Sequence, residues 1–125
     1  MRTWSVVIAM LLAATSALAH HSNSAFDPDK VVVLKGTVTE WRWVNPHVWI
    51  HLSVDDGNGG RTEWQIEGRS PGVLARSGWS RTIFKAGDTI TVDFSPARDG
   101  SRSGLTTRVT LADGTVLSQA SPGAQ

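Results

Sequence analysis

The chain contains 125 residues and no cysteine, and its 12 Lys and Arg against 11 Asp and Glu give a formal net charge of +1 at pH 7. This nearly neutral balance argues against nucleic-acid binding, which depends on clustered basic side chains that neutralise phosphates. Without cysteine the chain has no disulfide, no thiolate metal ligand and no thiol nucleophile. Its fold must therefore be held together by the hydrophobic core alone.

Residues 1–19 have the features of a secretory signal peptide. Arg2 supplies the positive start, Val6 to Ala14 the apolar run, and Ala17-Leu18-Ala19 a cleavage site of the A-x-A type. The apolar run is shorter than the ~20 residues needed to span a bilayer. We therefore expect a periplasmic or secreted mature chain that begins at His20. Loss of Arg2 would leave 11 Lys and Arg, equal to the 11 Asp and Glu.

The mature chain is long enough for one small domain, which an arm precedes. Residues 20–30 are polar apart from Phe26, so we expect them to lie on the surface, pinned by that ring. Val31 to Val44 is a long β-type run, and its Gly36 predicts a bulge or bend that lets one strand serve both sides of a barrel. Asn45-Pro46 then predicts a turn, because proline restricts its own φ and the residue before it.

A hairpin is predicted next. His47 to Val54 alternates, with one apolar face and a second face that carries His47, Trp49 and His51. A Gly-rich turn connects this run to Arg61 to Glu67. A register centred on the middle of the turn places Gln65 opposite His51 and Glu67 opposite Trp49.

The remaining chain predicts one short helix and further strands. Ser70 as N-cap and Pro71 at the first helical position begin the helix, and Gly78 ends it. The later strands are expected at Thr89 to Phe94, at Leu105 to Leu111, and at a short return through Val116 and Leu117.

The order β-β-β-α-β-β predicts an all-β protein with one short helix, a five-stranded OB-like Greek-key barrel. We expect the barrel to occupy residues 31–117. Residues 118–125 lack the apolar content to fold and are expected to form a flexible tail.

Two histidines at the expected mature N-terminus suggest a metal site. A terminal His20 would offer its α-amine and imidazole together, and a third nitrogen would complete a set suited to Cu(II), which favours tetragonal nitrogen ligation. His47 and His51 lie about 13 Å apart on a strand, so both cannot easily reach one ion at about 2 Å. We predict copper binding by His20, His21 and His47, with His51 and Glu67 as support. The alternative is a merely polar N-terminus and a turn-capping His47.

A second hypothesis is a metal-free binding module. Trp41, Trp43 and Trp49, with Asn45 nearby, could form a platform on which a flat ligand or a partner protein stacks. The alternative is that these rings cover the barrel and pack under the arm with Phe26.

The sequence does not support an enzyme. Glu63 and Glu67 could act as bases or orient an imidazole, although charges on an exposed strand face are commonly just solvated. No Ser-His-Asp arrangement with a nucleophile elbow, no Gly-rich phosphate loop and no HExxH motif is present. We therefore expect a monomeric binding protein whose partner is a metal ion, a small ligand or another periplasmic protein.

Several motifs together resemble a family of small exported bacterial proteins of unknown function. The matching segments are H-H-S from His20, F-D at Phe26, K-G-T-V-T from Lys35, W-x-N-P-H from Trp43, W-x-x-E from Trp64, S-P-x-x-L-x-R-x-G-W from Ser70, G-D at Gly87, P-A-x-D-G from Pro96 and L-A-D-G from Leu111. The resemblance covers nearly the whole mature chain. It implies a signal peptide and an OB-like barrel, and it brings no substrate or reaction with it.

Overall fold

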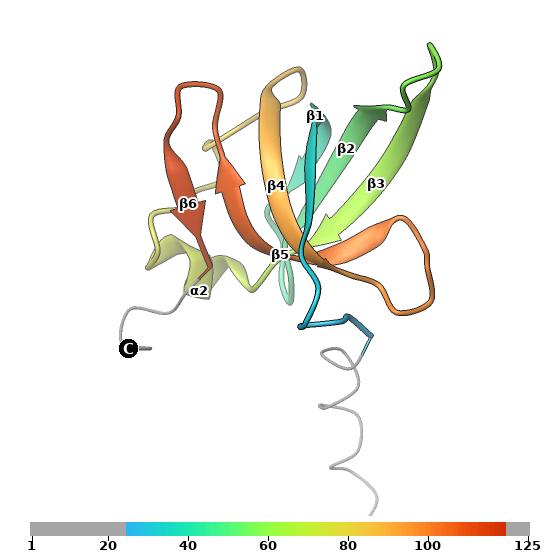
Figure 1. The fold of residues 1–125 in the computed structure, drawn as a ribbon. Coiled ribbons are helices and arrows are strands. Elements are labelled where there is room, and N and C mark those ends of the chain that lie inside the picture. The colour runs from blue at the N-terminus through green and yellow to red at the C-terminus, as the bar shows by residue number, and fades with distance from the viewer. Residues whose placement is uncertain (1–24, 120–125) are drawn as a thin grey trace, which may run out of the picture.

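The computed structural model describes residues 25–119, and the structural statements below refer to this part of the chain. It contains one short helix and six strands (Figure 1). The elements are β1 (Val32–Arg42), β2 (Trp49–Asp55), β3 (Arg61–Glu67), α2 (Pro71–Ala75), β4 (Thr89–Pro96), β5 (Ser103–Thr110) and β6 (Val116–Ser118). Each predicted element is present. β2 begins two residues later than expected, β5 begins two residues earlier, and α2 ends at Ala75, three residues before Gly78.

The strands close into the predicted OB-like barrel. The first half of β1 pairs with β4 and its second half pairs with β2, with the change of partner at Thr37. β3 then pairs in parallel with the start of β5, which closes the ring β1-β2-β3-β5-β4. The prediction that one long strand serves both sides of the barrel is therefore confirmed.

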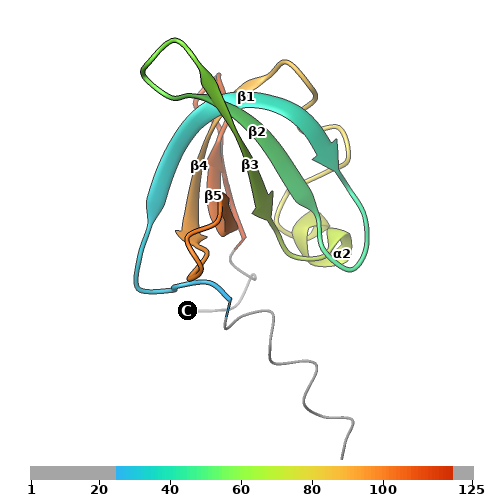
Figure 2. The same ribbon diagram turned by 90° about the vertical axis from the view of Figure 1, so that its right-hand side faces the viewer.

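Figure 2 shows β1 arching over the barrel, and two positions allow this path. A Cβ on Gly36 would lie 2.9 Å from the Ser53 carbonyl oxygen, so β1 can approach β2 this closely only at a glycine. The register shift lies between Val38 and Glu40. The irregularity is therefore at Thr39, three residues after the glycine at which the sequence predicted it.

Apolar side chains from every strand fill the barrel. The fully buried members are Val38, Val48, Ile50, Leu52, Ile66, Leu74, Val92, Phe94 and Val109. α2 starts as predicted, because the Ser70 Oγ accepts a hydrogen bond from the Val73 N–H at 3.4 Å. Within residues 25–119 no helix is long and apolar enough to cross a membrane.

The described part of the arm is attached to the end of β4. Phe26 forms a β-bridge with Ala97, the Asp27 N–H donates to the Pro96 carbonyl at 2.9 Å, and the Arg98 N–H donates to the Ala25 carbonyl at 2.9 Å. In both ribbon views this segment crosses the lower end of the barrel, close to the start of β5 (Figures 1 and 2). The arm is therefore pinned at Phe26, as the sequence predicted.

The chain packs against the barrel for two residues beyond the expected boundary at residue 117. Ser118 belongs to β6, and Gln119 is only 4% exposed. The Gln119 N–H donates to the Thr107 carbonyl at 3.2 Å, and its Oε1 accepts from the Arg69 N–H at 2.9 Å. Two backbone groups of other elements thus hold a polar residue in the fold, which hydrophobicity alone does not predict. The rest of the expected tail, 120–125, lies outside the described residues.

Candidate functional site

His47 lies between the Asn45-Pro46 turn, whose peptide bond is cis, and the start of β2. The next residue, Val48, makes two backbone hydrogen bonds. Its N–H donates to the Arg69 carbonyl at 3.1 Å, and its carbonyl accepts from the Gly68 N–H at 2.9 Å. These bonds hold His47 beside the end of β3. Its Nδ1 lies 2.5 Å from the Oε1 of Glu67.

This contact sets the orientation of the imidazole. The Glu67 side chain is 12% exposed, whereas that of His47 is 39% exposed. An Nδ1–H that donates to the carboxylate leaves Nε2 as the atom with a lone pair. Metal-binding histidines usually show this arrangement, with one ring nitrogen held by a carboxylate and the other on the metal.

A hollow of about 470 Å³ lies against this pair, and it is lined by Phe26, Pro28, His47, Glu67, Gly68, Arg69, Ser95 and Leu105. Three of these residues form one cross-strand row, because Glu67 pairs with Leu105 and Leu105 pairs with Ser95. The row comes from β3, β5 and β4, the strands that close the barrel. The arm residues Phe26 and Pro28 complete the hollow from the other side.

His51 has different neighbours from His47. The predicted hairpin register is confirmed, with Gln65 opposite His51 and Glu67 opposite Trp49. On its other side His51 faces Glu40 of β1, and the His51 Nδ1 lies 4.0 Å from the Glu40 Oε2, which is too long for a hydrogen bond. Glu63 pairs with Ser53 and is exposed. The structure thus gives the two strand histidines separate carboxylates on opposite sides of β2.

The three tryptophans of the proposed platform do not share a face, which corrects that expectation. Trp41 pairs with the buried Ile50, and its ring packs 4.4 Å from Phe84 and 5.6 Å from Trp43, centroid to centroid. Trp49 pairs with Arg42 and Glu67 and so faces away from the core. The register shift at Thr39 is the reason that Trp41 and Trp49 lie on different faces of the sheet.

The remaining members of the expected platform are Trp43 and Asn45. Trp43 packs against the core, whereas Asn45 is exposed in the turn before His47. The alternative is correct in that Trp41 and Trp43 pack on the barrel, but the rings beside Trp41 are those of Trp43, Trp79 and Phe84, where the alternative expected Phe26 of the arm.

His20 and His21 lie outside the described residues. Between residues 25 and 119 no group of three or more His, Asp or Glu side chains is placed to hold a metal ion. His47 and Glu67 are the pair that the structure brings together from the predicted site. Further metal ligands would have to come from elsewhere.

Sequence reasoning did not assign Gly68, Arg69, Ser95 or Leu105 to the site. Ser95 and Leu105 lie on strands whose side chains alternate between the two faces, so the sequence could predict that both point outward. It could not predict the parallel pairing that places β5 beside β3.

The fold and the hollow define a small OB-like barrel with a hollow beside the described part of its N-terminal arm. No curated protein matches the chain. A family model matches residues 8–108, and the chain belongs to that family, the family of unknown function DUF6152.

Proposed function

We propose that this protein is an exported binding protein that holds Cu(II) through His47 and the histidines at its mature N-terminus. The observation that carries the proposal is the 2.5 Å contact between the His47 Nδ1 and the Glu67 Oε1, which presents Nε2 for a metal. Copper(II) suits a set of imidazole and amine nitrogens in a tetragonal arrangement.

The position of the arm supports the participation of the N-terminus. Phe26 lines the same hollow as His47. His21 precedes Phe26 by five residues, a length of chain that spans at most about 17 Å when extended. A segment that starts beside the hollow can thus bring imidazole and α-amine nitrogens to Nε2 of His47.

The first test combines intact mass measurement of the exported protein with a calorimetric Cu(II) titration. We expect a mature chain that begins at His20 and binds one equivalent tightly. An added Gly-Ser before His20 should weaken binding by orders of magnitude, because it removes the terminal amine from its imidazole. Unchanged affinity in the extended chain would show that the N-terminus is not a ligand.

Two histidines of the same strand region provide a matched pair of variants. His47→Gln should weaken Cu(II) binding strongly, whereas His51→Gln should leave the affinity unchanged because its neighbour is Glu40 on the far side of β2. Glu67→Gln should lower the affinity by ~10–100-fold, the usual cost of losing the group that orients a metal-binding imidazole. Equal effects of the His47 and His51 variants would contradict the proposed site.

A further inference from the structure

The hollow contains groups that the copper proposal does not use. Ser95, Leu105, Arg69 and the arm residues line it together with the histidine–glutamate pair. Its volume of about 470 Å³ lies within the range of roughly 300–1,000 Å³ that is typical of small-molecule sites. Such sites combine apolar walls with a few converging polar groups, and both are present here.

Ser95 places a polar group in the wall of the hollow. The residue is only 8% exposed, yet no hydrogen bond joins its hydroxyl to any residue between 25 and 119. Its Oγ is not one of the fully enclosed polar atoms of residues 25–119 that lack a partner, which are Thr106 Oγ1 and Gln119 Nε2. A ligand in the hollow can therefore reach this hydroxyl and bond to it.

The charges of the hollow favour an anion over a cation. The Glu67 carboxylate is already engaged by the His47 Nδ1 at 2.5 Å. Arg69 also lines the hollow, and a guanidinium carries five donors in a planar fork, enough for its present contact and for a carboxylate. Phe26, Pro28 and Leu105 supply apolar surface for the body of the ligand.

We propose that the hollow binds a small organic carboxylate with an aliphatic or aromatic body. The carboxylate bonds to Arg69 and Ser95, and the apolar body packs between Leu105 and Phe26. The contacts of this ligand do not include Nε2 of His47, so the inference stands apart from the copper proposal.

The test uses the mature protein in EDTA, which keeps metal out of the measurement. Phenylacetate is titrated while amide chemical shifts are recorded by NMR. We expect saturable shifts at Ser95, Leu105 and Gly68, with a dissociation constant below about 1 mM. Phenylacetamide lacks the charge and acetate lacks the apolar body, so each should bind at least tenfold more weakly.

Matched variants distinguish the hollow from general charge attraction. Arg69→Gln and Ser95→Ala should each weaken phenylacetate binding at least fivefold, whereas Arg76→Gln, at an exposed position after α2, should not. Amide spectra of the variants away from the hollow report whether each retains the fold. Absence of saturable shifts, equal binding of the three probes, or an unchanged affinity in a folded Arg69→Gln protein would overturn the proposal.

Discussion

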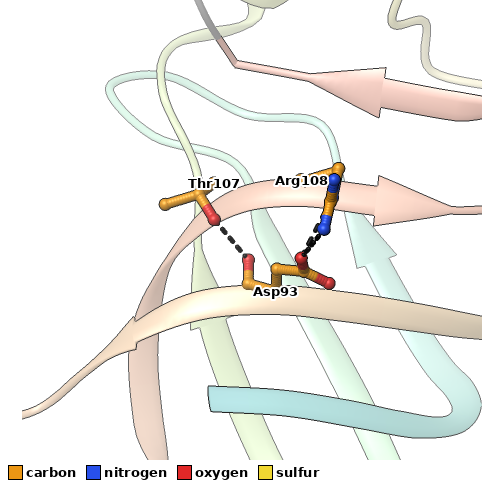
Figure 3. A network of polar contacts seen from close by, with 3 residues as sticks. All are labelled: Asp93, Thr107 and Arg108. Atoms are coloured by element: carbon orange, nitrogen blue, oxygen red, sulfur yellow. Dashed lines mark hydrogen bonds and ion pairs between the residues drawn. The ribbon is translucent and has the colours of Figure 1, made fainter. Parts of the chain in front are cut away.

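Asp93 is a buried carboxylate on β4, and its partners explain how the barrel tolerates it. The Arg108 Nε donates to its Oδ2 at 3.0 Å, and the Nη2 of Arg108 contacts the same oxygen. The Thr107 hydroxyl donates to the Asp93 carbonyl at 3.0 Å (Figure 3). Thr107 is the extra residue where the β4–β5 register shifts, so its side chain bonds to the backbone beside the irregularity.

Arg108→Met should lower the free energy of unfolding by about 1–2 kcal/mol, because it leaves the carboxylate of Asp93 without its cationic partner. The figure is modest because the Arg108 side chain is 56% exposed, so water can reach part of the pair. Arg81→Met, at an exposed turn position, is the control and should change stability by less than about 0.5 kcal/mol. Urea denaturation measures both. Equal stabilities would show that the pair contributes nothing.

At the scale of elements, the closing strand β5 depends on Gly104. Gly104 pairs with Ile66 of β3 and with Pro96 of β4. A Cβ at this position would lie 2.1 Å from the Phe94 ring and 2.7 Å from the Ser95 carbonyl oxygen. The barrel can therefore close over Phe94 only where β5 carries no side chain.

We expect Gly104→Ala to destabilise the protein by about 3 kcal/mol, since overpacking displaces a core ring and a strand carbonyl. Gly72→Ala is the matched substitution, because nothing lies within 4 Å of its Cβ position in α2. It should be neutral or stabilising by about 0.5–1 kcal/mol, since alanine favours a helix. Thermal and urea unfolding compare the two. A Gly104→Ala protein as stable as Gly72→Ala would contradict this account of closure.

For the whole molecule, acid stability should depend on aspartates that lie outside the strands. Hydrogen bonds lower the pKa of the carboxyl groups of Asp27 in the arm and of Asp88, Asp99 and Asp113 in the loops between strands. For Asp88 the main cause of the lower pKa is the backbone N–H of Lys85, which donates to its Oδ2 at 3.0 Å, and the Lys85 ammonium adds to it. For Asp113 the pKa is lowered chiefly by the Thr115 N–H, at 2.8 Å.

A carboxyl group whose pKa is lower in the folded protein stabilises the fold when it is ionised. This contribution is complete above the unfolded pKa of about 3.9, and it is lost as pH falls through the lower folded pKa. We therefore expect the free energy of unfolding to fall between about pH 4 and pH 2. A protein with Asp88→Asn and Asp113→Asn should show a shallower decrease over this interval. Parallel pH profiles for the two proteins would exclude these turns as the source.

The hairpin and the helix were predictable because their signals are local. Alternation from His47 to Val54, the Gly-rich turn and the Ser70-Pro71 start each specify a short-range structure. The register that places Gln65 opposite His51 follows from the length of the turn and the face that must be buried.

The candidate site was only partly predictable. The predicted hairpin already placed Glu67 near the histidines. The direct contact between Glu67 and His47 follows from the backbone hydrogen bonds of Val48 with Gly68 and Arg69. The sequence did not predict that Trp41 and Trp49 lie on different faces of the sheet. The cause is one extra residue in β1, Thr39, which changes the β1 side chains that share a face with a given β2 side chain.

By itself, the sequence determined the order of strands, the short helix after the third strand, the bent first strand and the arm pinned by Phe26. Propensity, alternation and turn chemistry act over a few residues, and these features need nothing more. The tertiary structure alone decided that β5 lies beside β3, that Ser95 and Leu105 face the same hollow as His47, and that Gln119 is buried. These contacts join segments far apart in the chain, and their geometry depends on how closely strands approach at positions such as Gly104 and Gly36.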